Sequence, residues 1–181
     1  TEPAYNDAAF AAITPGTSGA YSAGEALYLE GNYNWDTTIT INGGTFISEH
    51  NYAIRAQFLE EDAEHNIEIN GGTFEGAQGV IFDKHADNTY ADTHNPSDAA
   101  LALDAVTVTN GSFSSNVSDY CIDGFTAEQG QDGKYTIKMK DNMAVTVTDA
   151  DGNTVGAYET LDEAIAVAGS GDIITLLDDV N

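Results

Sequence analysis

The residues best suited to acid–base chemistry lie on a short segment that recurs along the chain. Arg55 is the only arginine, and two residues after it stands Gln57, whose place Glu30 and Asp83 take in the copies before and after. A polysaccharide lyase needs a base for the proton next to a carboxylate and clustered acids that hold Ca²⁺. An inverting hydrolase needs two carboxyl groups, and Glu30 and Asp83 are expected two strand spacings, roughly 10 Å, apart. Because the set lacks a dense carboxylate cluster, we expect no enzyme activity.

Calcium is the only cofactor for which the sequence holds a candidate loop. Asp149, Asp151 and Asn153 place oxygen ligands at alternate positions. The EF-hand pattern, however, requires Gly where Thr154 stands and a bidentate Glu where Thr160 stands. We therefore expect an ordinary Asp-Gly hairpin turn here and no bound cofactor.

The histidines and the single cysteine form no metal or nucleophile motif. His50, His65, His85 and His94 lack metal-ligand spacing, and only the last two could meet. Cys121 has no second cysteine for a disulfide and lies in an apolar segment, so we expect it to be a core residue.

A repeated motif determines how these residues are positioned. Two copies of NGGTF begin 28 residues apart, at positions 42 and 70, and a worn copy, NGSF, begins 40 residues later, at position 110. Before each copy, Ile or Val alternates with polar residues, which is typical of a strand with one buried face. Asn-Gly then favours a turn with positive φ. The residues expected to recur in space are Asn42, Gly44, Phe46, Asn70, Gly72, Phe74, Asn110, Gly111 and Phe113.

A repeat of this length is typical of a solenoid in which each copy forms one rung. Rungs stacked in parallel lie roughly 4.8 Å apart, so Phe would stack on Phe and Asn on Asn, with hydrogen bonds between the stacked amides. The alternative is an antiparallel β-sandwich with coincidental Gly-Gly turns. A sandwich does not need the same residue at the same place in each copy, so we favour an all-β chain built as a short parallel β-helix.

A second strand follows the aromatic residue of the first two copies, at positions 53–56 and 79–82. Positions 26–29 resemble the same strand of an earlier rung, with offsets of 27 and 26 between the three. If Leu27, Ile54 and Val80 point inward, then Tyr28, Arg55 and Ile81 point outward. This outward column offers a cation and an aromatic ring beside the acids of the neighbouring column. The candidate ligand-binding residues are Tyr28, Arg55, Tyr52, Trp35 and Asp83.

The motif I-x-I-N-G-G-T-F resembles the right-handed parallel β-helix repeats of the pectin-lyase-like superfold. More narrowly, it resembles the GGTF-repeat, adhesin-like surface proteins of Gram-positive gut bacteria. Residues 158–165 and 171–178 are similar to the opening unit of such modules. The resemblance implies a right-handed solenoid. Because the superfold also hosts polysaccharide lyases and hydrolases, it leaves activity open.

The charge of the chain excludes several partners. Thirty acidic residues against five basic ones give a net charge of −25. Nucleic-acid binding needs Lys and Arg against phosphate, and an anionic membrane surface would repel this chain. We expect no nucleic-acid or membrane partner, and we interpret the charge as keeping a secreted protein soluble.

Three regions are expected. Residues 1–25 would form an entry segment that covers the end of the solenoid, and residues 26–125 would form the rungs, with a polar insertion at 84–97. Residues 126–181 would form a small α+β unit with two hairpins, a helix that starts in a Thr160–Glu163 capping box, and a buried strand after Asp172. This unit would cap the solenoid or begin the next module of a longer polypeptide.

We therefore expect a non-catalytic adhesion or display module of a bacterial protein that is extracellular, on the cell surface or attached to the cell wall. Carbohydrate binding on the outward column is the second hypothesis, and a polysaccharide lyase or hydrolase is the third. The expected partners are a host or dietary glycan, a surface protein, or other modules of the same parent chain.

Overall fold

A computed structural model describes residues 25–31, 36–58, 65–85 and 105–177. These residues form strands, a short 3₁₀ turn and one α-helix, so the prediction of a mostly β chain is confirmed. The strands belong to four separate sheets, none of them closed on itself. Of the expected entry segment 1–25 only Glu25 is described, and most of the insertion 84–97 lies outside the described residues.

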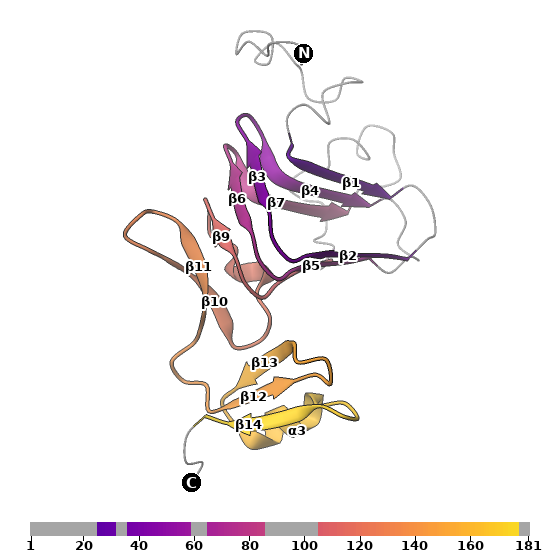
Figure 1. The fold of residues 1–181 in the computed structure, drawn as a ribbon, viewed down its shortest axis with the longest axis vertical. Coiled ribbons are helices and arrows are strands. Elements are labelled where there is room, and N and C mark those ends of the chain that lie inside the picture. Colours follow the sequence, from indigo (N-terminus) through magenta and orange to yellow (C-terminus); the bar gives the residue numbers. More distant parts are fainter. Residues whose placement is uncertain (1–24, 32–35, 59–64, 86–104, 178–181) are drawn as a thin grey trace.

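Three of the sheets are built from strands that recur along the chain (Figure 1). The first contains, in parallel, β1 (Leu27–Gly31), β4 (Tyr52–Phe58) and β7 (Gly79–His85). The second contains, also in parallel, β2 (Thr37–Ile41), β5 (His65–Ile69) and β8 (Val106–Val108). The third begins with parallel β3 (Thr45–Ser48), β6 (Thr73–Gly76) and β9 (Ser112–Phe113).

Apolar side chains from all three sheets meet in one core. Ile54 of β4, Ile67 and Ile69 of β5, and Phe74 of β6 are fully buried and belong to the same cluster. A single strand could not bury these residues, because it contributes only the side chains on its inward face. Their burial therefore depends on contacts between sheets.

The predicted column of phenylalanines is confirmed. Phe74 stacks on Phe46 with ring centroids 4.9 Å apart and on Phe113 with centroids 5.4 Å apart. The angle between the ring planes is only 3° in the first pair and 11° in the second, so the rings are nearly parallel. The repeated aromatic position therefore forms a continuous stack across the third sheet.

The glycine before each of the strands β3, β6 and β9 has positive φ. The angle is 109° at Gly44, 120° at Gly72 and 140° at Gly111. Other residues rarely adopt this conformation. A Cβ on Gly111 would also lie 2.7 Å from the Phe113 ring. The turn and the aromatic stack therefore require glycine at the same place.

The predicted alignment of Asn110 with Asn70 is wrong by one residue. The amide of Asn70 donates to Asn42 Oδ1 at 3.4 Å, as expected for stacked asparagines. In the third copy, however, Val108 pairs with Ile69 and Ser112 with Thr73, which places Thr109 over Asn70. The Thr109 hydroxyl donates to Asn70 Oδ1 at 2.7 Å, so a shorter hydroxyl group replaces the third amide.

The register of β7 against β4 also differs from the predicted one. Leu27, Ile54 and Ile81 are neighbours across the first sheet, which gives an offset of 27 in both steps. Phe82, rather than Ile81, therefore lies beside Arg55.

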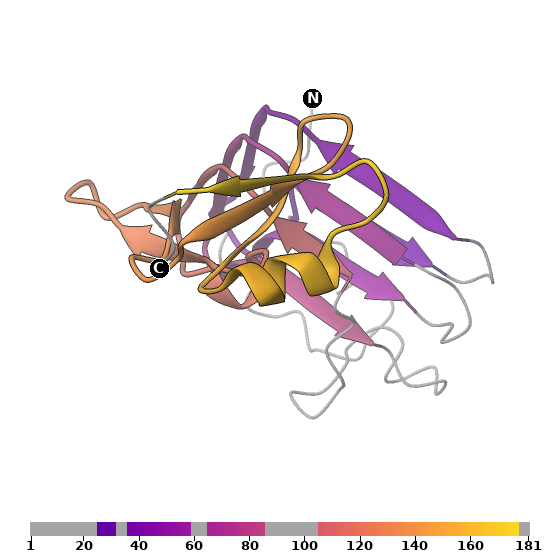
Figure 2. The same ribbon diagram turned by 90° about the horizontal axis from the view of Figure 1, so that it is seen from below.

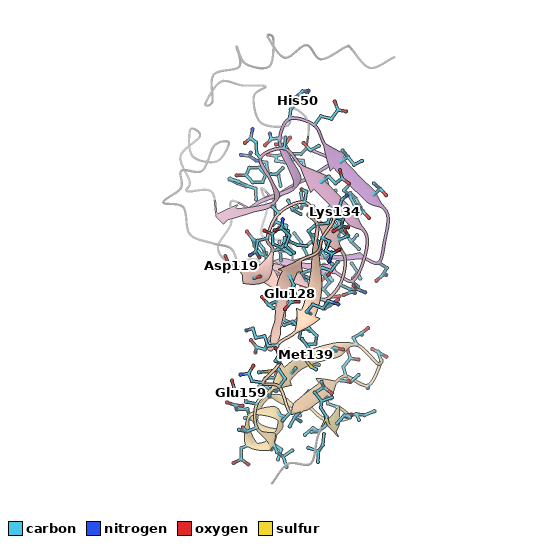
Figure 3. The ribbon with its side chains drawn as sticks, turned by 90° about the vertical axis from the view of Figure 1, so that its left-hand side faces the viewer. His50, Asp119, Glu128, Lys134, Met139 and Glu159 are labelled. Carbon is cyan, nitrogen blue, oxygen red and sulfur yellow. The ribbon has the colours of Figure 1, made fainter. Side chains whose placement is uncertain are left out.

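The first predicted C-terminal hairpin belongs to the third sheet instead of the α+β unit. Its strands are β10 (Phe125–Gln129) and β11 (Tyr135–Met139), preceded by the 3₁₀ turn η1 (Ser118–Tyr120). β11 pairs antiparallel with β9, and Lys134 forms an ion pair with Glu75 of β6 (Figure 3). The hairpin thus covers the last parallel strand, so the expected boundary at residue 126 falls inside this sheet.

A second, smaller core lies in the C-terminal unit. Its strands β12 (Val145–Thr148), β13 (Thr154–Tyr158) and β14 (Ile173–Leu176) are antiparallel in the order β13-β12-β14. Helix α3 (Leu161–Val167) lies on one side of this sheet, over Val145 and Val147 (Figure 2). The predicted capping box is confirmed, since Thr160 and Glu163 bond each other's backbone N–H groups.

Helix α3 buries Ala164, whereas Leu161 and Ile165 are exposed. One prediction about this unit is wrong. β14, expected to be buried, leaves Ile173 60% and Leu176 52% exposed. Among the described strands β14 pairs only with β12, so it is an edge strand whose apolar composition misled the prediction.

Candidate functional site

The predicted outward column does not form an exposed binding face. Tyr28 and Arg55 are neighbours across the first sheet, as predicted, with Phe82 beyond them. The Arg55 residue, however, is only 6% exposed, while Ile54 on the opposite face is fully buried. Both faces of β4 are therefore covered at this point.

Arg55 is held by a negative charge and an aromatic ring. Its Nη1 lies 3.6 Å from Glu25 Oε1, and its guanidinium carbon lies 4.4 Å from the centre of the Phe82 ring. Asn51 donates to the same Glu25 oxygen at 2.7 Å. A buried cation needs such partners, so this cluster is an internal anchor of the first sheet.

The other carboxylate oxygen of Glu25, Oε2, is buried and accepts no hydrogen bond from the described residues. Burial raises the pKa of this carboxyl above its ordinary value, although a backbone hydrogen bond and the charge of Arg55 act in the opposite direction. The Glu25–Arg55 pair therefore carries an unrelieved desolvation cost.

The remaining predicted ligand-binding residues are only partly described. Tyr52 is half-buried, and its ring packs at 5.2 Å on that of Phe82. The backbone of Asp83 pairs with Ala56 in the first sheet, but its side chain lies outside the described part, as does that of Glu30. Trp35 lies outside the described residues altogether. The structure thus places Arg55 and Tyr52 against Phe82, with Tyr28 beside Arg55 across the sheet.

The candidate calcium loop is closed by its own hydrogen bonds. Asp149 accepts from the backbone N–H groups of Asp151 and Asn153 at 2.9 and 2.8 Å, and from the Asn153 amide at 3.0 Å. The hydrogen bond from the Asn153 side chain is the main cause of a lowered pKa of the Asp149 carboxyl. Among the described residues, no three His, Cys, Asp or Glu side chains gather in a way that could hold a metal ion.

Cys121 is half-buried rather than part of the core. Its thiol donates weakly to the Val117 carbonyl at 3.5 Å. Burial raises the pKa of the thiol, which disfavours the nucleophilic thiolate. Of the four histidines, His94 and the side chains of His65 and His85 lie outside the described part, and His50 is half-buried in the turn before β4.

The structure contains a groove of about 300 Å³, which we call the amide groove and which was not predicted from the sequence. One wall is the turn that joins the second and third sheets, and the other is the start of β13 with the segment before β10. Its polar lining consists of Asn42, Asn70, Thr109, Asn110, Asn153 and Thr154. Ile122 and Phe125 supply its apolar surface. The NGG repeat indicates the wall that contains Asn42 and Asn70. No repeat in the sequence indicates that Asn153 and Thr154 form the opposite wall.

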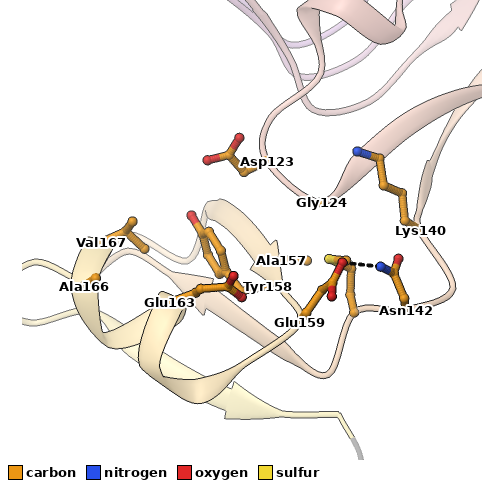
Figure 4. A pocket seen from close by; sticks show the side chains of 11 residues that line it. Asp123, Gly124, Lys140, Asn142, Ala157, Tyr158, Glu159, Glu163, Ala166 and Val167 are labelled. Carbon is orange, nitrogen blue, oxygen red and sulfur yellow. Dashed lines mark hydrogen bonds between the residues drawn. The ribbon is translucent and has the colours of Figure 1, made fainter.

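A second cleft, of about 550 Å³, lies between the C-terminal unit and Asp123 and Gly124, which we call the linking segment (Figure 4). Tyr158 lies within it, and burial, together with nearby Asp123, raises the pKa of its hydroxyl. Glu163 is bound to Thr160 in the capping box, and Glu159 accepts from the amide of Asn142 (Figure 4). Two of the carboxylates in this cleft are therefore already engaged within the protein.

The two units are connected directly at the floor of that cleft. The backbone N–H of Ala157 donates to the Asp123 carbonyl at 2.9 Å. Gly124 has φ of 77°, and a Cβ there would lie 2.1 Å from the Ala157 carbonyl oxygen. Close approach at a glycine thus fixes the C-terminal unit against the linking segment.

Comparison with protein-family models, curated proteins and solved structures finds no match. Among the described residues, no helix has the length and apolar character needed to cross a membrane.

Proposed function

We propose that residues 26–125 form a short right-handed parallel β-helix, and that the chain serves as a non-catalytic display or adhesion module of a bacterial surface or secreted protein. The observation that supports the fold is the pairing rule: each of the strands β1 to β6 pairs in parallel with the strand three positions later. A chain that returns to the same sheet after every third strand winds as a solenoid. Parallel crossovers are right-handed in about 98% of cases.

A stacked core suits a module whose task is to hold its shape. Phe74 and Phe113 are fully buried in the third sheet, and the Glu25–Arg55 pair ties the segment before β1 to β4 in the first. Such stacks resist bending because each rung is packed against the next. The net charge of −25 keeps the chain soluble and disfavours anionic ligands.

The burial of Arg55 supports a non-catalytic role. A lyase base must reach the substrate within hydrogen-bond distance, and the guanidinium group of Arg55 is instead occupied by Glu25 and Phe82. We propose that the partners are a glycan or protein surface and the other modules of a parent chain outside the cell.

Surface display tests this function. The chain is fused to a cell-wall anchor on a non-adherent bacterium, and retention on mucin-coated and epithelial surfaces is compared with that of the anchor alone. We expect greater retention with the intact chain, and its loss with Phe74→Ala if that variant unfolds. Retention equal to that of the anchor alone contradicts an adhesive role.

Catalysis is tested separately by incubating the chain with polygalacturonate, alginate and neutral plant polysaccharides. We expect no reducing ends and no unsaturated uronate above the level of a heat-inactivated sample. Sustained release of either product contradicts the non-catalytic assignment.

A further inference from the structure

The amide groove is lined by neutral groups in a strongly acidic chain. None of the described residues that line it carries a charge, although the sequence has thirty acidic residues. Its polar groups are amides and hydroxyls, and Phe125 contributes a half-buried aromatic ring. Ligand sites commonly combine an apolar surface with a few placed polar groups. This lining suits a neutral ligand with many hydroxyl groups.

Part of the hydrogen-bonding capacity of the groove is unused. Asn70 is occupied, because it donates to Asn42 and accepts from Thr109. In the described part of the chain, the side-chain nitrogens of Asn42 and Asn110 donate to no protein group, and both residues are exposed. Each carboxamide nitrogen carries two N–H donors, and the oxygens retain acceptor capacity.

The unused amides come from the first and third turns of the repeat, which line the same groove. Asn42 follows β2 and Asn110 follows β8, so β5 lies between them in the second sheet. Strands at this spacing set the two turns roughly 10 Å apart. The donors are thus spread along the groove, which matches an extended ligand better than a compact one.

We propose that the amide groove binds a neutral oligosaccharide. Sugar hydroxyls both donate and accept, so they can bond the amides of Asn42 and Asn110, while the Phe125 ring offers an apolar surface to a sugar face. In the part of the chain that the structure describes, no cation lines the groove to hold a uronate, and the net charge repels one. No carboxylate among these residues lines it to hold an amino sugar. The proposal goes beyond the display function, which needs no ligand at this place.

Amide NMR of the folded chain tests the proposal. The probes are cellotetraose, xylotetraose and mannotetraose, with tetragalacturonate and a glucosamine tetramer as charged counterparts. We expect at least one neutral probe to shift the side-chain amide signals of Asn42 and Asn110. The double variant Asn42→Ala/Asn110→Ala is expected to weaken binding about tenfold or more, from the loss of two hydrogen bonds.

Asn66→Ala is the matched control. Asn66 is also an exposed asparagine of the second sheet, but it bonds Glu68 and lies outside the groove. We expect it to bind as the unchanged chain does. The proposal is overturned if no neutral tetrasaccharide shifts these signals at about 10 mM, far above the micromolar range of specific sites. It is also overturned if the double variant binds like Asn66→Ala, or if a charged tetramer binds as tightly as the best neutral one. Retention in the surface-display assay is independent of these outcomes.

Discussion

The ring of Phe74 lies flat against that of Phe46, with centroids 4.9 Å apart and planes within 3° of each other. Both residues occupy the same place in the NGGTF repeat, and their strands pair in register, Thr45 with Thr73 and Phe46 with Phe74. A sequence repeat has thus become a physical contact, and the stability of the third sheet should depend on it.

Phe74→Ala is expected to lower the free energy of unfolding by about 3–5 kcal/mol, because Phe74 is fully buried and contacts a ring on each side. Phe46→Ala should cost less, since Phe46 is half-buried and ends the described column. Urea unfolding followed by circular dichroism measures both. Equal losses for the two variants contradict the central position of Phe74.

Gly124→Ala is expected to loosen the C-terminal unit. The variant adds a methyl group 2.1 Å from the Ala157 carbonyl oxygen at a residue with φ of 77°. Gly133→Ala is the control, because Gly133 has a similar φ of 82° but no atom within 4 Å of its added Cβ. The control should cost about 1–2 kcal/mol from backbone strain alone, and Gly124→Ala should cost more.

Hydrogen exchange locates the effect of Gly124→Ala. The Ala157 N–H, which donates to the Asp123 carbonyl, should exchange faster in this variant than in Gly133→Ala. Unchanged protection of Ala157 would show that the two units are not held together at this glycine.

The strand pairs could be predicted because their signals are local and repeated. Alternating Ile and Thr before Asn-Gly indicates a strand and a turn, and repetition indicates which strands are neighbours. The register could not be predicted to the residue. Thr109 rather than Asn110 lies over Asn70, because Asn110 stands only three residues before the aromatic residue of its copy, whereas Asn70 stands four before Phe74.

The side chains that surround Arg55 could not be predicted from the sequence, for a different reason. Its partner Glu25 is 30 residues away and lies before the first strand, where no repeat indicates a neighbour. The sequence showed that Arg55 falls between inward residues, but it did not show that the outer face of β4 is covered there. The amide groove was missed for the same reason, since β13 supplies part of its wall.

The Glu25 carboxyl should make stability depend on pH. Burial raises its pKa in the folded chain above the ordinary 4.5, so the folded chain holds this proton more tightly than the unfolded chain does. The resulting stabilisation is complete below the unfolded-state pKa and is lost as the pH rises through the folded-state pKa. Relative to Glu25→Gln, the unchanged chain should therefore lose stability as the pH rises above about 4.5.

Urea unfolding at a series of pH values measures this difference. Glu128→Gln controls for the loss of one negative charge, because Glu128 is exposed on β10 (Figure 3). The difference between the unchanged chain and Glu128→Gln should vary less with pH. An unchanged chain that gains stability relative to Glu25→Gln as the pH rises contradicts the raised pKa.

The exposed edge strand β14 should promote self-association once charge repulsion is screened. Ile173 is 60% exposed on a strand that pairs, among the described strands, only with β12. At about 1 M salt the Debye length falls to about 3 Å, so the net charge of −25 no longer keeps copies apart. Analytical ultracentrifugation should then detect dimers, and Ile173→Lys should weaken them about tenfold or more. Val167→Lys adds the same charge at an exposed apolar residue of α3 and should leave them unchanged. A wholly monomeric chain at high salt, or equal effects of the two variants, contradicts pairing through this edge.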